Sequence, residues 1–271
     1  MRYSTGGREN MPRRDGYTQG EPCWADLSAE DTEGAKAFYG GLFGWTWEDR
    51  SMPDSDMTYS MARKDGCNVA GLGPITPDLL AMGLRSVWNT YLAVDSADEA
   101  FRKAIEAGGR GLAEPFDVMT TGRMAYIMDN QGAAVGFWQA GDHRGAQLIK
   151  EPGTMSWSEL YVPDVGAATG FLGAVLGLTA ETADMGPMSY TLLKAGDEIV
   201  AGVMEPPENV PPSWSVYFGA ADINETAGSV TELGGQVMNG PFPTPLGQMI
   251  VAADPAGGVF LVHDYSTAAD C

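Results

Sequence analysis

Hydrophobic and polar residues alternate over two segments in the first half of the chain, residues 24–31 and 88–95, and each segment ends in an acidic residue. A period of two is typical of a half-buried β-strand. After each segment, apolar residues recur at spacings of three and four, which predicts a helix that stops at a glycine. Turn sequences such as KDG at 64–66 and DNQG at 129–132 then separate two or three short predicted strands. The pattern therefore predicts two consecutive βαβββ units.

The second half of the chain repeats the first half. Three blocks align: residues 22–45 with 155–178, 87–116 with 213–242, and 121–138 with 246–263. The first block pairs Trp24 with Trp157 and Asp26 with Glu159. Because self-similarity of this length indicates duplicated structural units, the chain is predicted to contain four βαβββ units.

The four units predict an α+β chain of two tandem domains. The units are expected at residues 20–76, 86–140, 153–206 and 212–265. The first two would form a domain at 20–142 and the last two a domain at 153–265, because the EPG sequence at 151–153 marks a boundary between them. Residues 1–19 are polar, basic and rich in glycine, so we expect a disordered N-terminal extension there.

The composition narrows the class of partner. Acidic residues outnumber basic ones by 36 to 16, which argues against nucleic acid because phosphate binding needs a basic surface. No segment approaches the ~18 consecutive apolar residues of a membrane helix, and the N-terminus lacks the apolar core of a signal peptide. Cys23, Cys67 and Cys271 form no CxxC pair, which fits a reducing compartment. We expect a cytoplasmic monomer or homodimer that binds a small hydrophobic or aromatic molecule, without nucleic acid or membrane partners.

Five segments resemble the vicinal oxygen chelate superfamily, the group of glyoxalases, bleomycin resistance proteins and extradiol dioxygenases. They are LSAED at 27–31, FYGGLFGW at 38–45, DNQGAAVGFWQ at 129–139, LYVPD at 160–164 and DPAGGVFLV at 254–262. The layout is most similar to two-domain glyoxalase-like proteins of actinobacteria, among them an acidic mycobacterial antigen. The resemblance implies that pairs of units form curled mixed sheets, each around a cavity for a small organic molecule.

The resemblance also implies where metal ligands would lie, and this sequence departs from that pattern. The family's first-strand and closing-strand ligand positions fall on Trp24, Asn89, Gly136, Trp157, Ser215 and Leu261. These residues do not make a set of carboxylate, imidazole or carbonyl donors for a divalent cation. The chain has only two histidines, His143 and His263, so a His-rich site is excluded. We expect no metal and no other cofactor, and neither glyoxalase I nor extradiol dioxygenase chemistry.

The alternation of a strand predicts which other side chains face each cavity. Residues two apart share a face, so a carboxylate lies beside each first-strand Trp, and a Tyr lies beside Asn89 and beside Ser215. The predicted inward residues are Trp24, Asp26, Asn89 and Tyr91 in the first domain, and Trp157, Glu159, Ser215 and Tyr217 in the second. A carboxylate enclosed by Trp would have a raised pKa, which suits a general base. The alternative is that the Trp residues are core and the carboxylates only accept structural hydrogen bonds.

Two charged or titratable residues outside these sets, His263 and Arg123, are further candidates. His263 shares the inward face of its strand and is a candidate proton shuttle, or else a partly exposed polar residue. Arg123 is a candidate clamp for a ligand carbonyl or anion over the first cavity, or else a surface arginine. His143, in the loop GDHRG, is interpreted as part of the linker.

These observations favour a metal-independent enzyme that acts on an aromatic or polyketide-like metabolite. Asp26, Glu159 or His263 would move protons, and Trp24, Asn89, Tyr91, Arg123, Trp157, Ser215 and Tyr217 would bind the substrate. Isomerisation, cyclisation, hydration and cofactorless oxygenation all fit such a site. The alternative is a non-catalytic protein of the bleomycin-resistance type that sequesters an antibiotic. A structural or signalling protein is suggested only by the resemblance to the antigen.

Overall fold

The computed structural model describes residues 13–52, 57–185, 188–244 and 247–264. The first half contains β1 (Pro22–Ala29), α1 (Thr32–Phe43), β2 (Thr46–Ser51), β3 (Thr58–Lys64), β4 (Cys67–Pro74), α2 (Pro77–Ala81), β5 (Val87–Ala93), α3 (Ala97–Glu106), β6 (Arg110–Val118), β7 (Gly122–Met128) and β8 (Ala134–Ala140). The second half contains β9 (Met155–Tyr161), α4 (Val165–Leu176), β10 (Thr179–Met185), β11 (Met188–Ala195), β12 (Glu198–Met204), β13 (Ser213–Gly219), α5 (Ile223–Glu232), β14 (Gln236–Thr244), β15 (Gly247–Ala253) and β16 (Val259–Asp264).

Each half forms one mixed sheet of eight strands. The strand order is β2-β3-β4-β1-β5-β8-β7-β6 in the first sheet and β10-β11-β12-β9-β13-β16-β15-β14 in the second. Within a unit the first and last strands are parallel, as in β1 with β4, and the two units of a sheet meet at an antiparallel pair, as in β1 with β5. The predicted α+β fold of four βαβββ units in two tandem domains is confirmed. The short helix α2, between the first two units, was not predicted.

Equivalent residues start and stop the equivalent helices of the two halves. The side chain of Asp31 accepts a hydrogen bond from a backbone N–H in the first turn of α1, and Asp164 does the same for α4. Such caps satisfy N–H groups that the helix itself leaves unpaired. Gly44 and Gly177 follow the two helices with φ angles of 70° and 74°, a left-handed conformation that glycine adopts without strain. The internal repeat therefore extends to the signals that bound the helices.

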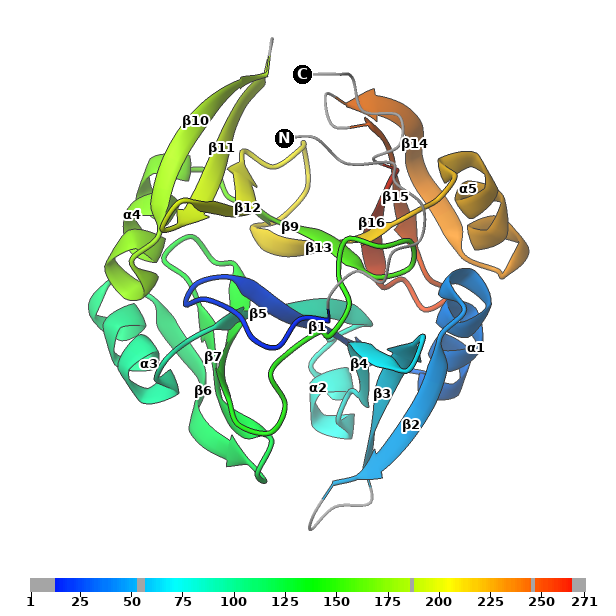
Figure 1. Cartoon of the computed structure of the whole chain (residues 1–271), viewed down its shortest axis with the longest axis horizontal. Coiled ribbons are helices and arrows are strands. Elements are labelled where there is room, and N and C mark those ends of the chain that lie inside the picture. Colours follow the sequence, from blue (N-terminus) through cyan, green and yellow to red (C-terminus); the bar gives the residue numbers. More distant parts are fainter. Residues whose placement is uncertain (1–12, 53–56, 186–187, 245–246, 265–271) are drawn as a thin grey trace.

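The hydrophobic core joins the two halves. One cluster combines the second and third units, with Phe137 from the first sheet and Phe171 from α4. Another combines the first and fourth units, with Phe38 from α1 and Phe260 from β16. Helices of different halves accordingly lie side by side, α3 with α4 and α1 with α5 (Figure 1). The helices thus cover the outer face of each sheet, and the inner face, which carries Trp24, is left for other contacts.

The first described residues pack against the rest of the chain. Arg14 donates a backbone hydrogen bond of 3.0 Å to the carbonyl of Gln147, and the Tyr17 hydroxyl donates one of 2.6 Å to the carbonyl of Ala146. The expectation of disorder is therefore wrong for residues 13–19, because a backbone N–H and a tyrosine hydroxyl of this segment find partners in the segment after β8. Residues 1–12, which carry the rest of that expectation, lie outside the described residues.

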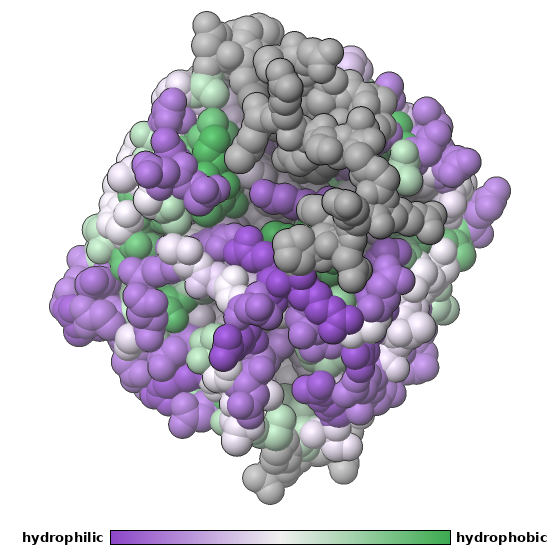
Figure 2. All heavy atoms as spheres, viewed as in Figure 1, coloured by the Kyte–Doolittle hydropathy of each residue, from purple (hydrophilic) through white to green (hydrophobic). Residues whose placement is uncertain are grey.

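The described surface is mostly hydrophilic on the face shown in Figure 2. Hydrophobic side chains appear there in smaller separate groups. Within the described ranges, no helix is both long enough and apolar enough to span a membrane.

Candidate functional site

The inner face of the first sheet carries a buried carboxylate that three side chains contact. The pairing of β1 with β5 places Trp24 opposite Tyr91 and Asp26 opposite Asn89. The Asp26 carboxylate accepts hydrogen bonds from Asn89 Nδ2 at 2.9 Å, from the Tyr91 hydroxyl at 3.1 Å and from the Tyr59 hydroxyl of β3 at 3.0 Å. The Trp24 indole donates to the same Tyr59 hydroxyl at 3.0 Å. We call these five residues the Asp26 cluster.

The second sheet repeats this arrangement. The pairing of β9 with β13 places Trp157 opposite Tyr217 and Glu159 opposite Ser215. Glu159 accepts hydrogen bonds from the hydroxyls of Tyr190 at 2.6 Å and Tyr217 at 2.5 Å. The Trp157 indole donates to the Tyr190 hydroxyl at 2.9 Å. We call these residues the Glu159 cluster, and its chain of indole, tyrosine and carboxylate matches that of the first half.

A glycine beside each carboxylate makes room for the tyrosine. Gly71 of β4 pairs with Asp26, and a Cβ atom at Gly71 would lie 1.9 Å from the Tyr59 hydroxyl oxygen. Gly202 of β12 pairs with Glu159, and a Cβ atom there would lie 2.0 Å from the hydroxyl oxygen of Tyr190. Real Cβ atoms do not approach so closely, so any other residue at these glycines would push the tyrosine off its carboxylate.

The outer partners of the two clusters differ. In the first, the Tyr126 hydroxyl donates to Asn89 Oδ1 at 2.7 Å, and Asn89 Nδ2 also donates to the Ser28 hydroxyl at 2.9 Å. In the second, the position aligned with Ser28 is Tyr161, whose hydroxyl lies 3.3 Å from that of Tyr217. Because Asn and Ser are replaced by Ser and Tyr, the two clusters present different donors around their carboxylates.

Burial determines the protonation of the Asp26 cluster. Asp26 is 8% exposed, and its burial raises the pKa of the carboxyl, against the opposing effect of the hydrogen bonds from Asn89, Tyr59 and Tyr91. Burial and the nearby Asp26 charge also raise the pKa of Tyr59 and Tyr91, so both hydroxyls remain protonated donors. None of the ion pairs formed by the described residues includes Asp26. The carboxyl is therefore suited to exchange a proton nearer to neutral pH than an exposed aspartate.

His143 lies against the Asp26 cluster although it belongs to the linker. Its ring centroid is 4.4 Å from that of Trp24 and 5.6 Å from that of Trp138, both in edge-to-face geometry. Burial lowers the pKa of the imidazole to about 4, so the ring is neutral at pH 7. Its buried Nε2 has no hydrogen-bond partner in the described part of the chain. The interpretation of His143 as linker alone missed this contact, and no local sequence pattern indicates it.

The structure separates the two remaining candidates. His263 is buried, 4% exposed, and its ring centroid lies 6.4 Å from that of Tyr217, so it is close to the Glu159 cluster. Arg123 instead binds Asp98 at 2.7 Å and Asp117 at 2.9 Å. Its neighbour Met124 packs on the inner face, so the alternation of β7 turns Arg123 toward α3, which carries Asp98. The structure does not bring Arg123 to the Asp26 cluster.

Sequence reasoning also missed Tyr59 and Tyr190, although the sequence contains a signal for them. The segments MTYSMARKDG at 57–66 and MSYTLLKAGD at 188–197 place the two tyrosines at matching positions. Extending the repeat alignment to β3 and β11 would have identified both. Tyr126 has no such signal, because the aligned residue in the second half is Val251.

The positions where the resemblance implies metal ligands do not fit a divalent cation. Trp24 and Trp157 stand at two of them, and at Gly136 a Cβ atom would lie 2.2 Å from the Tyr91 ring, so no longer side chain fits there. Within the described ranges, no group of three or more His, Cys, Asp and Glu residues is placed to hold a metal. We therefore derive no chemical step through a metal ion.

Two pockets lie near the clusters, and neither is lined by Asp26 or Glu159. One of about 30 Å³ lies beside Trp157, and one of about 270 Å³ lies beside Trp138. Met61 and Met124 pack in the same buried group as Trp24. Because Asp26 is only 8% exposed, a ligand that contacts it requires neighbouring side chains to move, and methionine adapts readily to such a change.

Comparisons with known proteins agree with this architecture. Residues 24–137 and 142–261 match the profile of the Glyoxalase/Bleomycin resistance protein/Dioxygenase superfamily. CFP32 of Mycobacterium tuberculosis, named as a glyoxylase, is 42% identical over 93% of this chain and 97% of its own. The anthracycline biosynthesis protein DnrV of Streptomyces peucetius is 34% identical over 91% of this chain and 94% of its own.

Solved structures show the same fold at low sequence identity. The Mn(II)-bound glyoxalase of Novosphingobium aromaticivorans superposes with a TM-score of 0.63 at 16% identity, over 92% of this chain and 83% of its own. The 2,3-dioxygenase LapB of Pseudomonas sp. KL28 superposes with a TM-score of 0.62 at 14% identity, over 91% of this chain and 93% of its own. From the two matched regions and these relatives, the chain belongs to the Glyoxalase/Bleomycin resistance protein/Dioxygenase superfamily.

Proposed function

We propose that this chain is an enzyme that acts on a small aromatic, polyketide-like molecule through acid–base chemistry of its own side chains, without a metal ion. The observation that carries the proposal is the buried Asp26 carboxyl, which two tyrosine hydroxyls and an amide contact and which forms no ion pair with any described residue. Desolvation raises its pKa toward the range in which a carboxylate both takes and returns protons.

The chemistry that this cluster supports is proton transfer next to a carbonyl. The Asp26 carboxylate takes a proton from a carbon beside the substrate carbonyl, and the electron pair of that C–H bond becomes an enolate. Once Asp26 is protonated and neutral, the hydroxyls of Tyr59 and Tyr91, which donated to its carboxylate, turn to the negative oxygen and stabilise it. The proton then returns from Asp26 to a different atom of the same molecule. The net reaction is an isomerisation, which needs no oxidant and no cofactor.

The substrate class rests on the relatives and on the cluster's surroundings. DnrV and its Streptomyces counterpart DauV, at 34% and 35% identity, are named for anthracycline biosynthesis. Anthracyclines have fused aromatic rings with carbonyl and hydroxyl groups. Trp24 and His143 supply aromatic surfaces of the kind that such rings contact.

A binding protein without chemistry is the second candidate. It is favoured by the low exposure of Asp26, whose two carboxylate oxygens already accept hydrogen bonds from within the protein. In that case the carboxylate would hold the tyrosines in place, and the aromatic walls alone would bind the ligand.

Turnover of anthracyclinones, the sugar-free anthracycline ring systems, tests the proposal. The full chain is incubated with a panel of them and the products are separated by liquid chromatography with mass detection. We expect a product of unchanged mass, and a rate at least 100-fold lower in Asp26→Asn, because general acid–base catalysis contributes about 10²–10⁴-fold. Glu159→Gln reports whether the second cluster takes part.

The matched control is Glu114→Gln, which removes one exposed carboxylate outside both clusters. Circular dichroism of each variant verifies that the fold is retained. Turnover by Asp26→Asn at the parent rate would exclude Asp26 as the base, and binding without any product would favour the second candidate.

A further inference from the structure

The 270 Å³ pocket lies at one end of the inner face of the first sheet, away from Asp26. Its floor is formed by Ala93 of β5 and Ala140 of β8, and its walls include the rings of Tyr17 and Trp138. Asp26 is opposite Asn89, and Ala93 is four residues further along β5, which corresponds to about 13 Å at ~3.3 Å per residue. The pocket is therefore separate from the Asp26 cluster.

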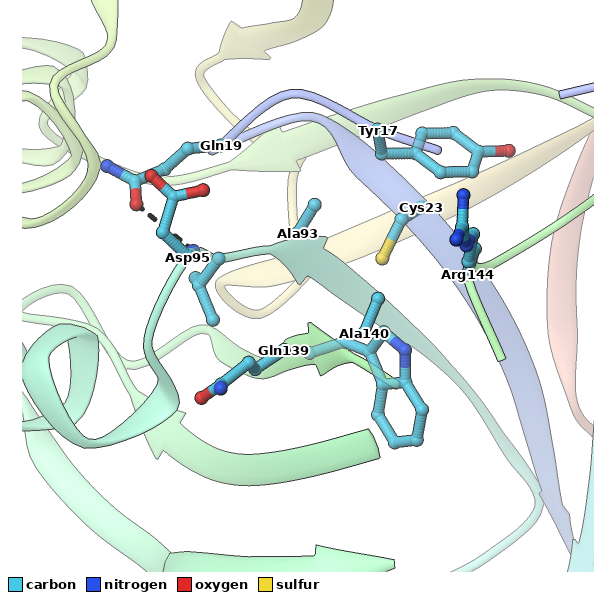
Figure 3. Close-up of a pocket in the computed structure, with 10 residues that line it drawn as sticks. Tyr17, Gln19, Cys23, Ala93, Asp95, Gln139, Ala140 and Arg144 are labelled. Carbon is cyan, nitrogen blue, oxygen red and sulfur yellow. Dashed lines mark hydrogen bonds between the residues drawn. The ribbon is translucent and has the colours of Figure 1, made fainter. Parts of the chain in front are cut away.

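The two charged side chains of the pocket stand at opposite ends. Figure 3 shows Arg144 beneath Tyr17 at one end, and Asp95 beside Gln19 at the other. Arg144 Nη1 donates to the backbone carbonyl of Asp15 at 3.0 Å. In the part of the chain that the structure describes, neither Arg144 nor Asp95 belongs to an ion pair.

Several polar groups between the two ends of the pocket already form hydrogen bonds within the protein. The Gln19 amide is used at both atoms, since Oε1 accepts from the backbone N–H of Asp95 at 3.2 Å and Nε2 donates to the Leu176 carbonyl at 3.2 Å. Gln139 Oε1 accepts from the backbone N–H of Ala97 at 3.0 Å. These hydrogen bonds hold the walls in place, so the two charged groups are the principal polar groups left for a ligand.

Size and charge limit what the pocket accepts. At ~30 Å³ per water molecule, its volume corresponds to about nine waters, or a ligand with a single ring and a short side chain. A simple anion would be repelled by the net charge of −20 on the chain, whereas a molecule with both charges would not. Tyrosine and tryptophan rings in the walls favour an aromatic ring.

We propose that this pocket binds a small aromatic zwitterion whose carboxylate and ammonium group lie on opposite sides of the ring, so that the carboxylate pairs with Arg144 and the ammonium group pairs with Asp95. The ring lies between them, against Trp138 and Tyr17. A guanidinium binds a carboxylate through two parallel N–H donors, so Arg144 defines the orientation of the ligand. This site is independent of the acid–base function proposed for Asp26.

Three probes with the same benzene ring test the charge requirement by isothermal titration calorimetry. 4-(Aminomethyl)benzoate carries a charge on each side of the ring, benzylamine carries only the ammonium group, and benzoate carries only the carboxylate. We expect saturable binding of 4-(aminomethyl)benzoate, at least tenfold tighter than that of either other probe. Arg144→Met should weaken the binding of 4-(aminomethyl)benzoate at least tenfold and leave that of benzylamine unchanged, whereas Asp95→Asn should weaken the binding of 4-(aminomethyl)benzoate and leave that of benzoate no weaker.

Control variants test whether binding depends on the pocket itself and not on the net charge of the chain or on the Asp26 cluster. Arg110→Met removes an exposed arginine outside the pocket and should leave the affinity for 4-(aminomethyl)benzoate unchanged. Ala140→Leu adds bulk to the lining of the pocket and should abolish binding, while Asp26→Asn should retain it. The proposal is overturned if 4-(aminomethyl)benzoate does not bind, if benzylamine binds as tightly, or if Arg144→Met leaves the affinity for 4-(aminomethyl)benzoate unchanged.

Discussion

At the scale of single residues, the described partners of Asp26 are neutral donors, two tyrosine hydroxyls and an amide. The two tyrosine hydroxyls satisfy Oδ2 and the Asn89 amide satisfies Oδ1, but these hydrogen bonds offset only part of the cost of burying the charge. The folded protein therefore binds the Asp26 proton more tightly than the unfolded chain does, since burial raises the pKa above 3.8. By linkage, the stability that this group contributes is present below pH 3.8 and is lost as the pH rises through the raised pKa.

Asp26→Asn should remove this pH dependence. We expect the free energy of unfolding of the parent to fall relative to that of Asp26→Asn as the pH rises from about 4 through the raised pKa, because the neutral amide bears no desolvation cost of a charge. Urea denaturation at intervals between pH 4 and 8 measures the difference. For Glu114→Gln, at an exposed carboxylate, the free energy of unfolding plotted against pH should run parallel to that of the parent. A curve for Asp26→Asn that also runs parallel to the parent would contradict the raised pKa of Asp26.

At the scale of elements, equivalent strands and helices of the two halves carry the same key residues, but the side chains around the two carboxylates differ. β1 and β9 each present a Trp and a carboxylate to the inner face, and α1 and α4 each begin at an aspartate cap. The helix caps and the alternation of side chains along the strands are the same in both halves. The residues around the carboxylates differ, because Asn89 corresponds to Ser215 and Trp138 to His263. Duplication therefore preserved the scaffold while the partners of the carboxylates diverged.

Because both helices have the same aspartate cap, equivalent substitutions at the two caps are predicted to lower the free energy of unfolding equally. Asp31→Ala and Asp164→Ala should each lower the free energy of unfolding by about 1 kcal/mol, because each leaves a first-turn N–H without its side-chain acceptor. Chemical denaturation of both single variants and of the double variant gives the values. The replacements Asp31→Asn and Asp164→Asn, which keep an acceptor, serve as controls and should cost no more than a few tenths of a kcal/mol. A much larger loss at one helix would show that the caps are not equivalent.

At the scale of the whole molecule, the hydrophobic clusters do not follow the division into two sheets. Phe171 of the second half packs in the cluster of the second unit, and Phe38 of the first half packs in the cluster of the fourth. Neither half can bury its helix-covered face without the other. The two halves thus form one folding unit, in which the sheets keep separate inner faces.

Calorimetric unfolding should accordingly show one cooperative transition. A shared core couples the halves, so Phe171→Ala, which removes a buried ring at the junction, should lower the single midpoint rather than split it, at a cost of about 3–5 kcal/mol. Phe116→Ala, at a side chain that is 45% exposed, is the matched control and should change the midpoint little. Two separate transitions in the parent would contradict the shared core.

Periodicity and the internal repeat determine the βαβββ units, the capped helices and the face that Trp24 and Asp26 share, because these depend on the chain's own dihedral preferences and on residues close in sequence. The tertiary structure alone decides that Tyr59 reaches Asp26, that His143 packs on Trp24 and that Arg123 turns toward α3. Strand order and register bring these side chains together, and no local pattern encodes either. The register shift between Pro22 and Trp24 is an example, since it allows Cys23 to line the pocket beside Trp138.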